Sequence, residues 1–148
     1  MLKILSLVAS LFAVSSLPLE GAGVHLFSPD RQSTLFVQGG KSGRWGWTKG
    51  HREPSDTSWL ETAVREVKEE SGFILGQDYY ICKSTPDQYG KRLYWQGITY
   101  EHLPEPFHNS AEHQNIAWVS LQSLSKFDIT RDVEEWMISS RRVDCDFD

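Results

Sequence analysis

The segment from Trp59 to Ser71 constrains the fold more than any other part of the sequence. Its apolar residues recur at helical spacing and form a single stripe, made by Leu60, Ala63, Val64 and Val67. Gly72 stands where a helix commonly ends. The residues that can cap its start are Asp56, Thr57 and Ser58. The pattern therefore predicts a helix over Trp59–Ser71 with its stripe against a core.

Three glutamates, Glu66, Glu69 and Glu70, form an arc on one flank of that stripe, whereas Lys68 points away. Arg65 precedes Glu69 by one helical turn and can pair with it, but no cation at helical spacing neutralises Glu66 and Glu70. A solvated acidic face is the alternative, yet such a face would mix lysines into the arc. Because hard divalent cations prefer oxygen ligands, we predict a magnesium site here, with manganese as a substitute.

The rest of the chain reads as strands followed by a second helix. Short strands are predicted at residues 23–27, 34–38, 79–83, 93–100 and 115–119, and an amphipathic helix at residues 129–140. The segment Gly43–Gly50, rich in Gly and Trp, is predicted to be a loop with exposed or half-buried rings. At 148 residues the chain is long enough for one domain, so this order favours an α/β fold with a mixed sheet.

The two cysteines, Cys82 and Cys145, fit neither a disulfide scaffold nor the spacing of a zinc site. We predict two free thiols, one on a strand and one in the C-terminal tail.

The first residues are set apart from this domain. Lys3 is followed by an apolar run from Ile4 to Val14 and then by small residues. This pattern fits a secretory signal peptide over residues 1–16, but the run is too short for a stable membrane span. We therefore divide the chain into residues 1–19, an N-terminal extension or signal peptide, and residues 20–148, the folded domain. A cytoplasmic and a secretory location both stay open.

The formal net charge of -5 argues against a broad surface for duplex DNA or other duplex nucleic acid. It does not exclude a small phosphate-bearing substrate, because a bound divalent cation reverses the local sign.

The acidic helix and the residues before it resemble the signature of the Nudix hydrolases. That signature is a glycine, five residues, an acid, seven residues, Arg-Glu, an aliphatic residue, any residue, Glu-Glu, any residue, and a glycine before an apolar residue. Gly50 supplies its start, and Arg65 to Phe73 match every fixed position of its second half. Asp56 stands where the family has glutamate, and eight residues rather than seven separate it from Arg65.

The resemblance implies the Nudix α/β/α sandwich with a mixed central sheet, and hydrolysis of a phosphoanhydride bond. It implies that Glu66, Glu69 and Glu70 bind magnesium, with the Gly50 carbonyl as a further ligand. Arg65 would orient Glu69 by a salt bridge. The shorter carboxylate of Asp56 leaves its role open.

Outside the signature, two stretches resemble the asymmetrical diadenosine tetraphosphate hydrolases. They are the loop Trp47–His51 and the stretch from Ser110 to Asn115. The resemblance makes Glu112 a further metal ligand or the base for the attacking water. Lys49 and His51 are expected to contact phosphate, although a loop-stabilising hydrogen bond is an equal alternative for His51.

Tyr89, Lys91 and Arg92 are placed in a flexible loop, where they are candidates to clamp a base and phosphates. The predicted substrate is thus a small nucleotide, specifically a dinucleoside polyphosphate. RNA 5'-end decapping is the alternative within the family, and a non-catalytic Nudix-fold binding module is the alternative outside catalysis. The oligomeric state is left open.

Overall fold

The described strands form one mixed sheet between two helical layers. The computed structural model describes residues 18–100, 113–139, 143 and 145. Its strands are β1 (Gly21–Phe27), β2 (Ser33–Gly39), β3 (Trp45–Gly46), β4 (Thr48–His51), β5 (Tyr79–Ile81), β6 (Asp87–Tyr89), β7 (Arg92–Thr99) and β8 (His113–Ser120). Its helices are α2 (Trp59–Ser71), the short 3-10 helix η1 (Leu121–Lys126) and α3 (Arg131–Ser139).

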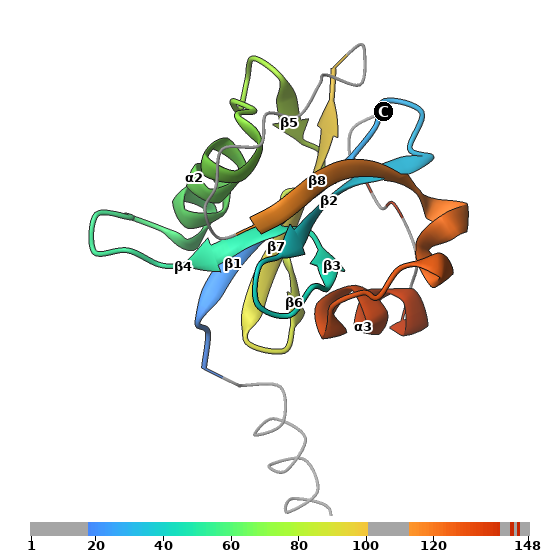
Figure 1. The fold of residues 1–148 in the computed structure, drawn as a ribbon. Helices are drawn as coiled ribbons and strands as arrows, with labels where there is room; N and C mark the ends of the chain where they lie inside the picture. The colour runs from blue at the N-terminus through green and yellow to red at the C-terminus, as the bar shows by residue number, and fades with distance from the viewer. Residues whose placement is uncertain (1–17, 101–112, 140–142, 144, 146–148) are drawn as a thin grey trace, which may run out of the picture.

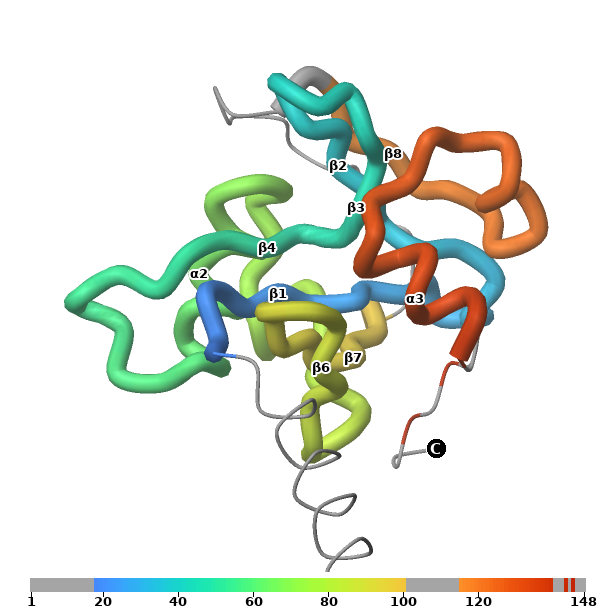
Figure 2. Tube along the Cα trace, turned by 90° about the horizontal axis from the view of Figure 1, so that it is seen from below, coloured from blue at the N-terminus to red at the C-terminus, as the bar shows by residue number. Residues whose placement is uncertain are grey.

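The sheet contains both parallel and antiparallel pairs. Its central order is β3-β2-β1-β7-β5, while β4 pairs with β1, β6 with β7, and β8 with β2. Strands β1 and β7 run parallel, with Gly21 opposite Arg92, and the other pairs are antiparallel. Because β1 pairs with β4 on one side and β7 on the other, it brings these two strands close together (Figure 2). The predicted mixed sheet is confirmed.

Alternate residues of β1 enter the core beneath α2. Ala22, Val24 and Leu26 are fully buried there. From α2, Ala63 and Val67 join the same core, as the predicted apolar stripe requires.

The other face of the sheet packs against α3. Phe27, which points away from α2, lies in a second core with Val133 and Trp136 of α3. Figure 1 shows α2 and α3 on opposite sides of the sheet. The α/β/α sandwich is therefore confirmed.

Helix α2 begins and ends as its local sequence predicts. Ser58 is the N-cap, and its hydroxyl accepts a hydrogen bond from the Glu61 amide at 3.1 Å. Gly72 ends the helix with φ 81°, a left-handed conformation that glycine adopts without strain, and its N–H donates to the Lys68 carbonyl.

The prediction of a loop over Gly43–Gly50 is wrong. This segment contains β3 and β4, and Trp47 between them is buried in the core beside α3. Pairing with distant strands imposes the extended backbone, since Thr48 lies opposite Val24 of β1. Trp45, as predicted for these rings, is half-buried.

The prediction of a flexible loop at Tyr89, Lys91 and Arg92 is also wrong. Tyr89 ends β6, Arg92 begins β7, and the two strands form a hairpin in which Tyr89 pairs with Arg92. Gly90 makes the turn with φ 59°.

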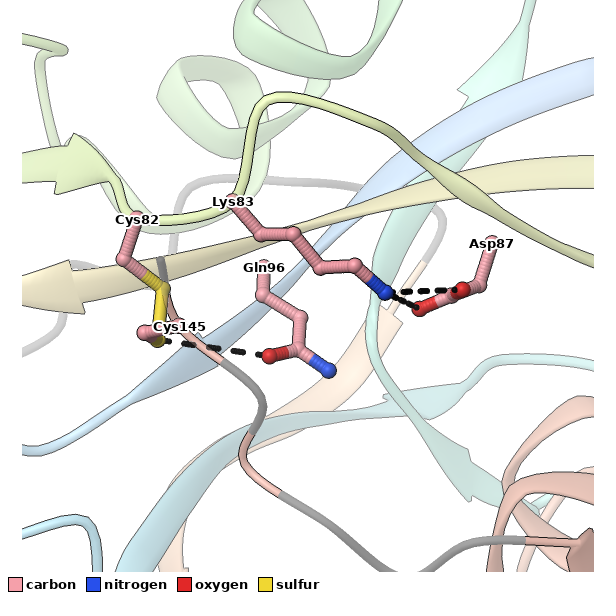
Figure 3. Close-up of a disulfide and its surroundings, with 5 residues drawn as sticks. All are labelled: Cys82, Lys83, Asp87, Gln96 and Cys145. Atoms are coloured by element: carbon pink, nitrogen blue, oxygen red, sulfur yellow. Dashed lines mark hydrogen bonds and ion pairs between the residues drawn. A yellow bond between two sulfur atoms is a disulfide. The ribbon is translucent and has the colours of Figure 1, made fainter. Parts of the chain in front are cut away.

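The two cysteines form a disulfide, contrary to the predicted free thiols. Cys82 and Cys145 are joined across 63 positions of sequence, with their Cα atoms 4.8 Å apart (Figure 3). Gln96 Oε1 lies 4.0 Å from the sulfur of Cys145. The bond attaches the C-terminal tail to the core on the α3 side, where Val143 also packs.

In the described part of the chain, no helix has the length and apolarity needed to cross a bilayer. Residues 1–17, which hold the predicted signal peptide, lie outside the described residues.

Candidate active site

Two glutamates of α2 are directed at β4 instead of into solvent. Glu66 and Glu70 lie one helical turn apart, and both are buried. The Glu70 carboxylate accepts a hydrogen bond from the backbone N–H of Lys49, with an N–O distance of 3.3 Å. The acidic arc predicted from the sequence is therefore partly enclosed between the helix and a strand.

Gly50 provides the space that the Glu66 carboxylate occupies. A Cβ atom built on Gly50 would lie 2.1 Å from Cδ of Glu66, far inside any van der Waals contact. Any larger residue at position 50 would displace this carboxylate. The glycine of the motif is thus explained by close approach of a side chain to the backbone.

Glu66 and Glu70 are both buried and carry like charges one helical turn apart, so the site disfavours ionisation of the pair. Burial, followed by the charge of Glu66, raises the pKa of Glu70 to about 9. Burial likewise raises the pKa of Glu66, against the opposing effect of Arg65. A pair of this kind costs the fold free energy at neutral pH unless a proton or a cation neutralises it.

Arg65 connects the helix to the loop that precedes it. Its guanidinium binds Asp56 through two parallel hydrogen bonds, Nε to Oδ1 at 3.1 Å and Nη2 to Oδ2 at 3.0 Å. Nη2 also donates to the His51 carbonyl at 2.9 Å. This hydrogen bonding to Asp56 raises the pKa of Arg65 and holds the pKa of Asp56 well below its usual range.

The remaining nitrogen of Arg65 binds the acidic arc. Nη1 lies 3.1 Å from both carboxylate oxygens of Glu69 and 2.9 Å from Oε1 of Glu66. The predicted salt bridge to Glu69 is present. The expectation that no cation is near Glu66 and Glu70 is wrong for Glu66, because the arginine next to it in sequence folds back onto it.

Asp56 is the site residue whose role the sequence left open. Its carboxylate is buried and also accepts hydrogen bonds from Thr62 Oγ1 and the Glu53 amide, both at 2.9 Å. The extra residue before Arg65 does not prevent this contact, since Asp56 lies in the loop between β4 and α2. Asp56 therefore anchors Arg65, and the signal for it was its place in the motif.

The residues predicted to bind substrate have different partners. Lys49 is half-buried, and burial, followed by the charge of Arg92, lowers the pKa of its amine. The ring of His51 is exposed, with Nδ1 3.2 Å from the Glu20 carbonyl, which is the loop-stabilising contact named as the alternative. Lys91 donates to Glu20 Oε1 at 3.1 Å.

Tyr89 packs among aromatic rings, with centroids 6.1 Å from those of Trp47 and Tyr94. Glu112, the predicted base or further ligand, lies outside the described residues. The structure thus brings together Gly50 and the acids of α2 with Arg65, and leaves Tyr89 and Lys91 in other contacts.

The acids of α2 fit a divalent cation in their chemistry. A cation would neutralise the buried pair Glu66 and Glu70, and carboxylate oxygens suit magnesium. Within the described ranges, no three His, Cys, Asp or Glu side chains are arranged to hold a metal ion. Arg65 holds the third acid of the arc, Glu69, in a salt bridge.

A family model for the NUDIX domain matches residues 17–138 of the chain. The chain belongs to the NUDIX family. The match spans the whole sheet together with α2, so the NUDIX motif found in the sequence lies where the family fold carries it.

Two curated relatives come from Saccharomyces cerevisiae, an mRNA-decapping enzyme subunit 2 and an m7GpppN-mRNA hydrolase. Each is 27% identical over 134 residues, covering 84% of this chain. This NUDIX chain spans 13% of the length of the curated relatives it matches.

Solved structures share the NUDIX fold at lower identity. An Ap4A hydrolase from C. elegans, solved as a binary complex, has a TM-score of 0.65 and 22% identity, covering 80% of this chain and 93% of that one. The NUDIX domain of Shewanella oneidensis NrtR, solved with ADP ribose, has a TM-score of 0.62 and 18% identity, covering 85% and 88%. These neighbours show the shared fold, and the family match supports a hydrolase that acts on pyrophosphate bonds.

Proposed function

We propose that this chain is a magnesium-dependent pyrophosphohydrolase that cleaves a dinucleoside polyphosphate such as diadenosine tetraphosphate. The observation that carries the proposal is the acidic pair Glu66 and Glu70, which is buried, with the Glu66 carboxylate packed against Gly50. A buried acidic pair is costly unless a cation neutralises it, and NUDIX hydrolases use divalent metals. Manganese is the expected substitute for magnesium.

In this proposal, Glu66, Glu69 and Glu70 hold the metal, and the Gly50 carbonyl is the further ligand. When bound, the metal polarises phosphate oxygens and lowers the pKa of a bound water. Glu69 is the more exposed acid, and Arg65 fixes both of its oxygens. Arg65 is therefore the residue that orients Glu69.

The proposal keeps Glu112 as the base or as a further metal ligand. On the substrate side, Lys49 and His51 contact phosphate, and Tyr89 and Lys91 contact the base and the outer phosphates. To contact substrate, Tyr89 must leave its packing against Trp47, and Lys91 must break its hydrogen bond to Glu20.

The second candidate is RNA 5'-end decapping. It is favoured by the similarity to the two yeast relatives, whose names state that reaction. The net charge of -5 weighs against it, because RNA-binding surfaces are usually basic. A binding module without catalysis is weakened by the complete set of acids from Glu66 to Glu70.

A substrate panel with product analysis tests these candidates. The purified chain is incubated with diadenosine tetraphosphate, capped RNA and 5'-triphosphate RNA, with magnesium or with EDTA. The proposal expects nucleotide products from diadenosine tetraphosphate in magnesium only, and their loss in Glu69→Gln. Cleavage of capped RNA with the dinucleotide untouched would overturn the proposed substrate and favour RNA decapping. Turnover in EDTA would overturn the metal assignment.

For location, we propose that the N-terminal segment directs the chain into an oxidising compartment. The Cys82–Cys145 disulfide supports this, because thiols in reducing compartments stay reduced. Residues 1–19 would then precede a mature domain of residues 20–148. Mass spectrometry of the protein from its natural source tests it, since a mature chain beginning near Glu20 with no free thiol is expected. A full-length chain with two free thiols would contradict it.

A further inference from the structure

A second polar cluster lies on the face of the sheet opposite α2. It consists of Lys49 of β4, Arg92 and Tyr94 of β7, and Asp132 of α3. Gly50 faces α2, so its neighbour Lys49 faces the α3 side. A Cβ built on Gly23 would lie 2.9 Å from Lys49 Cβ and 3.0 Å from Tyr94 Cε1, so both side chains border this glycine of β1.

Glycines of β1 separate the two cations of this cluster. Gly21 and Gly23 lie on the same face of β1, between β4 on one side and β7 on the other. A Cβ on Gly21 would lie 3.7 Å from Arg92 Cγ. Lys49 and Arg92 therefore rise from neighbouring strands on either side of a stretch that carries no side chain.

Among the described residues, Asp132 is the carboxylate that binds within this cluster. Its side chain is buried, and its Oδ2 accepts a hydrogen bond from the Tyr94 hydroxyl. The same oxygen lies 3.5 Å from Nη1 of Arg92. A buried carboxylate held by a phenol at one position can fix the guanidinium that approaches it.

The cluster contains two cations, Lys49 and Arg92, and the charges of Glu70 and Glu66 also act on the Lys49 amine. In the part of the chain that the structure describes, no carboxylate oxygen lies within 4.0 Å of the Lys49 amine, and Asp132 compensates only one of the two cations. The cluster is also joined to the acidic arc by a single peptide unit, because the Lys49 amide donates to Glu70. An anion held here would lie beside the proposed metal site, across β4.

We propose that Asp132 is a positioning residue that sets Arg92, and with it Lys49, to bind substrate phosphates away from the bond that is cut. This inference rests on the proposed function for its substrate. Asp132 does not touch the substrate. It fixes the direction of the Arg92 guanidinium, and it offsets the repulsion that would drive Arg92 and Lys49 apart.

The sign of the effect separates this role from simple electrostatics. Replacing Asp132 by Asn removes a negative charge beside an anion site. If Asp132 only contributed its charge, phosphate binding would become tighter. If Asp132 positions Arg92, binding becomes weaker despite the gain in positive charge.

The test is a double-mutant cycle on KM for diadenosine tetraphosphate, with variants D132N and R92Q. We expect D132N to raise KM by about tenfold with kcat changed by less than about threefold. D132N in the R92Q background should raise KM no further, since it acts through Arg92. The matched control is E135Q, which replaces a half-buried acid of the same helix that pairs with Arg131, and its KM should stay at the wild-type value.

A KM that is unchanged or lowered in D132N would overturn the proposal. A KM in the double variant that rises by the product of the two single effects would also overturn it. Because D132N can also reduce the folded fraction, isothermal titration with inorganic tripolyphosphate in metal-free buffer gives a second readout. We expect binding to weaken by about tenfold in D132N and in R92Q but not in E135Q.

The titration also separates this proposal from the proposed function. If no dinucleotide is hydrolysed but tripolyphosphate binding falls as expected, the proposed function fails and the role of Asp132 stands. If hydrolysis is observed and neither KM nor tripolyphosphate binding responds to D132N, the proposed function stands and the role of Asp132 fails. Absence of tripolyphosphate binding in the wild-type chain overturns the anion site.

Discussion

At the scale of single residues, the site depends on how closely a carboxylate approaches the backbone of β4. Glu66 occupies the space that a side chain at position 50 would fill. Glu70, one turn later, accepts a hydrogen bond from the same strand. A run of glutamates thus becomes a buried acidic pair because one glycine lets the helix lie close to β4.

Replacing Gly50 by Ala should move Glu66 and abolish metal-dependent hydrolysis. The new Cβ would lie 2.1 Å from the Glu66 carboxyl carbon, and such overpacking costs about 1–3 kcal/mol. Gly43→Ala is the control, because it strains a left-handed residue by about 1–2 kcal/mol in open space. Turnover and urea unfolding are measured for both. Equal activity of the two variants would contradict this account of Gly50.

The stability of the metal-free protein should fall as the pH rises. Burial raises the pKa of Glu70 from 4.5 to about 9, so between these values the folded chain keeps a proton that the unfolded chain has lost. The stabilising contribution is complete below pH 4.5, declines as the pH rises, and is gone once the pH passes about 9. Urea unfolding in EDTA across this pH range measures how steeply the free energy of unfolding falls with pH. The Glu70→Gln variant should show a less steep fall. If stability fell equally steeply with pH in both proteins, Glu70 would not be the group responsible.

At the scale of elements, the loop before α2 and the helix act as one unit through Arg65. Asp56 lies in the loop, and the guanidinium joins it to the acids of the helix. This connection holds the loop, and with it the backbone around His51, in a fixed position against the acidic arc.

Asp56→Asn should release Arg65 and disturb the acidic arc. The loss of two charge-assisted hydrogen bonds should cost about 1–2 kcal/mol and lower kcat. The matched control is Glu53→Gln, since Glu53 is 54% exposed and lies 3.4 Å from the same guanidinium, so its loss should change little. Thermal unfolding and turnover measure both effects. If the two variants behave alike, Asp56 is not the anchor of Arg65.

The elements differ in how well the sequence predicts them. Helix α2 was predicted to the residue, because Ser58 and Gly72 are local signals that act within one turn. Strands β3 and β4 were predicted as a loop, because their structure comes from pairing with β1 and β2, far away in sequence. Composition rich in Gly and Trp carries no information about such distant partners.

The same distinction holds for the site. The acids and Arg65 follow from a continuous motif on one helix, so the residues that gather there were predicted together. The link from Arg65 to Asp56 depends on the path of a loop, and the environment of Tyr89 depends on strands that the pattern missed.

At the scale of the whole molecule, β4 separates two charged regions. The acids of α2 lie on one face of the sheet, and the cations near Asp132 lie on the other. On the α3 side, the Cys82–Cys145 disulfide attaches the C-terminal tail to the core. Its partners are too far apart in sequence for spacing alone to pair them.

Removing this disulfide should lower the stability of the whole domain. A bond that closes 63 positions of sequence restricts the unfolded chain by about 4 kcal/mol in the loop-entropy model. Thermal unfolding with and without dithiothreitol measures the effect, and the Cys82→Ser/Cys145→Ser variant should match the reduced wild-type protein. A melting temperature that dithiothreitol leaves unchanged would contradict a structural bond.

Manganese binding followed by electron paramagnetic resonance measures whether the acidic pair on α2 holds a divalent cation. The signal of free manganese should fall when wild-type protein is added. The double variant Glu66→Gln/Glu70→Gln should bind at least about tenfold more weakly, while Glu135→Gln binds as the wild type does. If the double variant removes as much free manganese as the wild-type protein, the acids of α2 do not hold the metal.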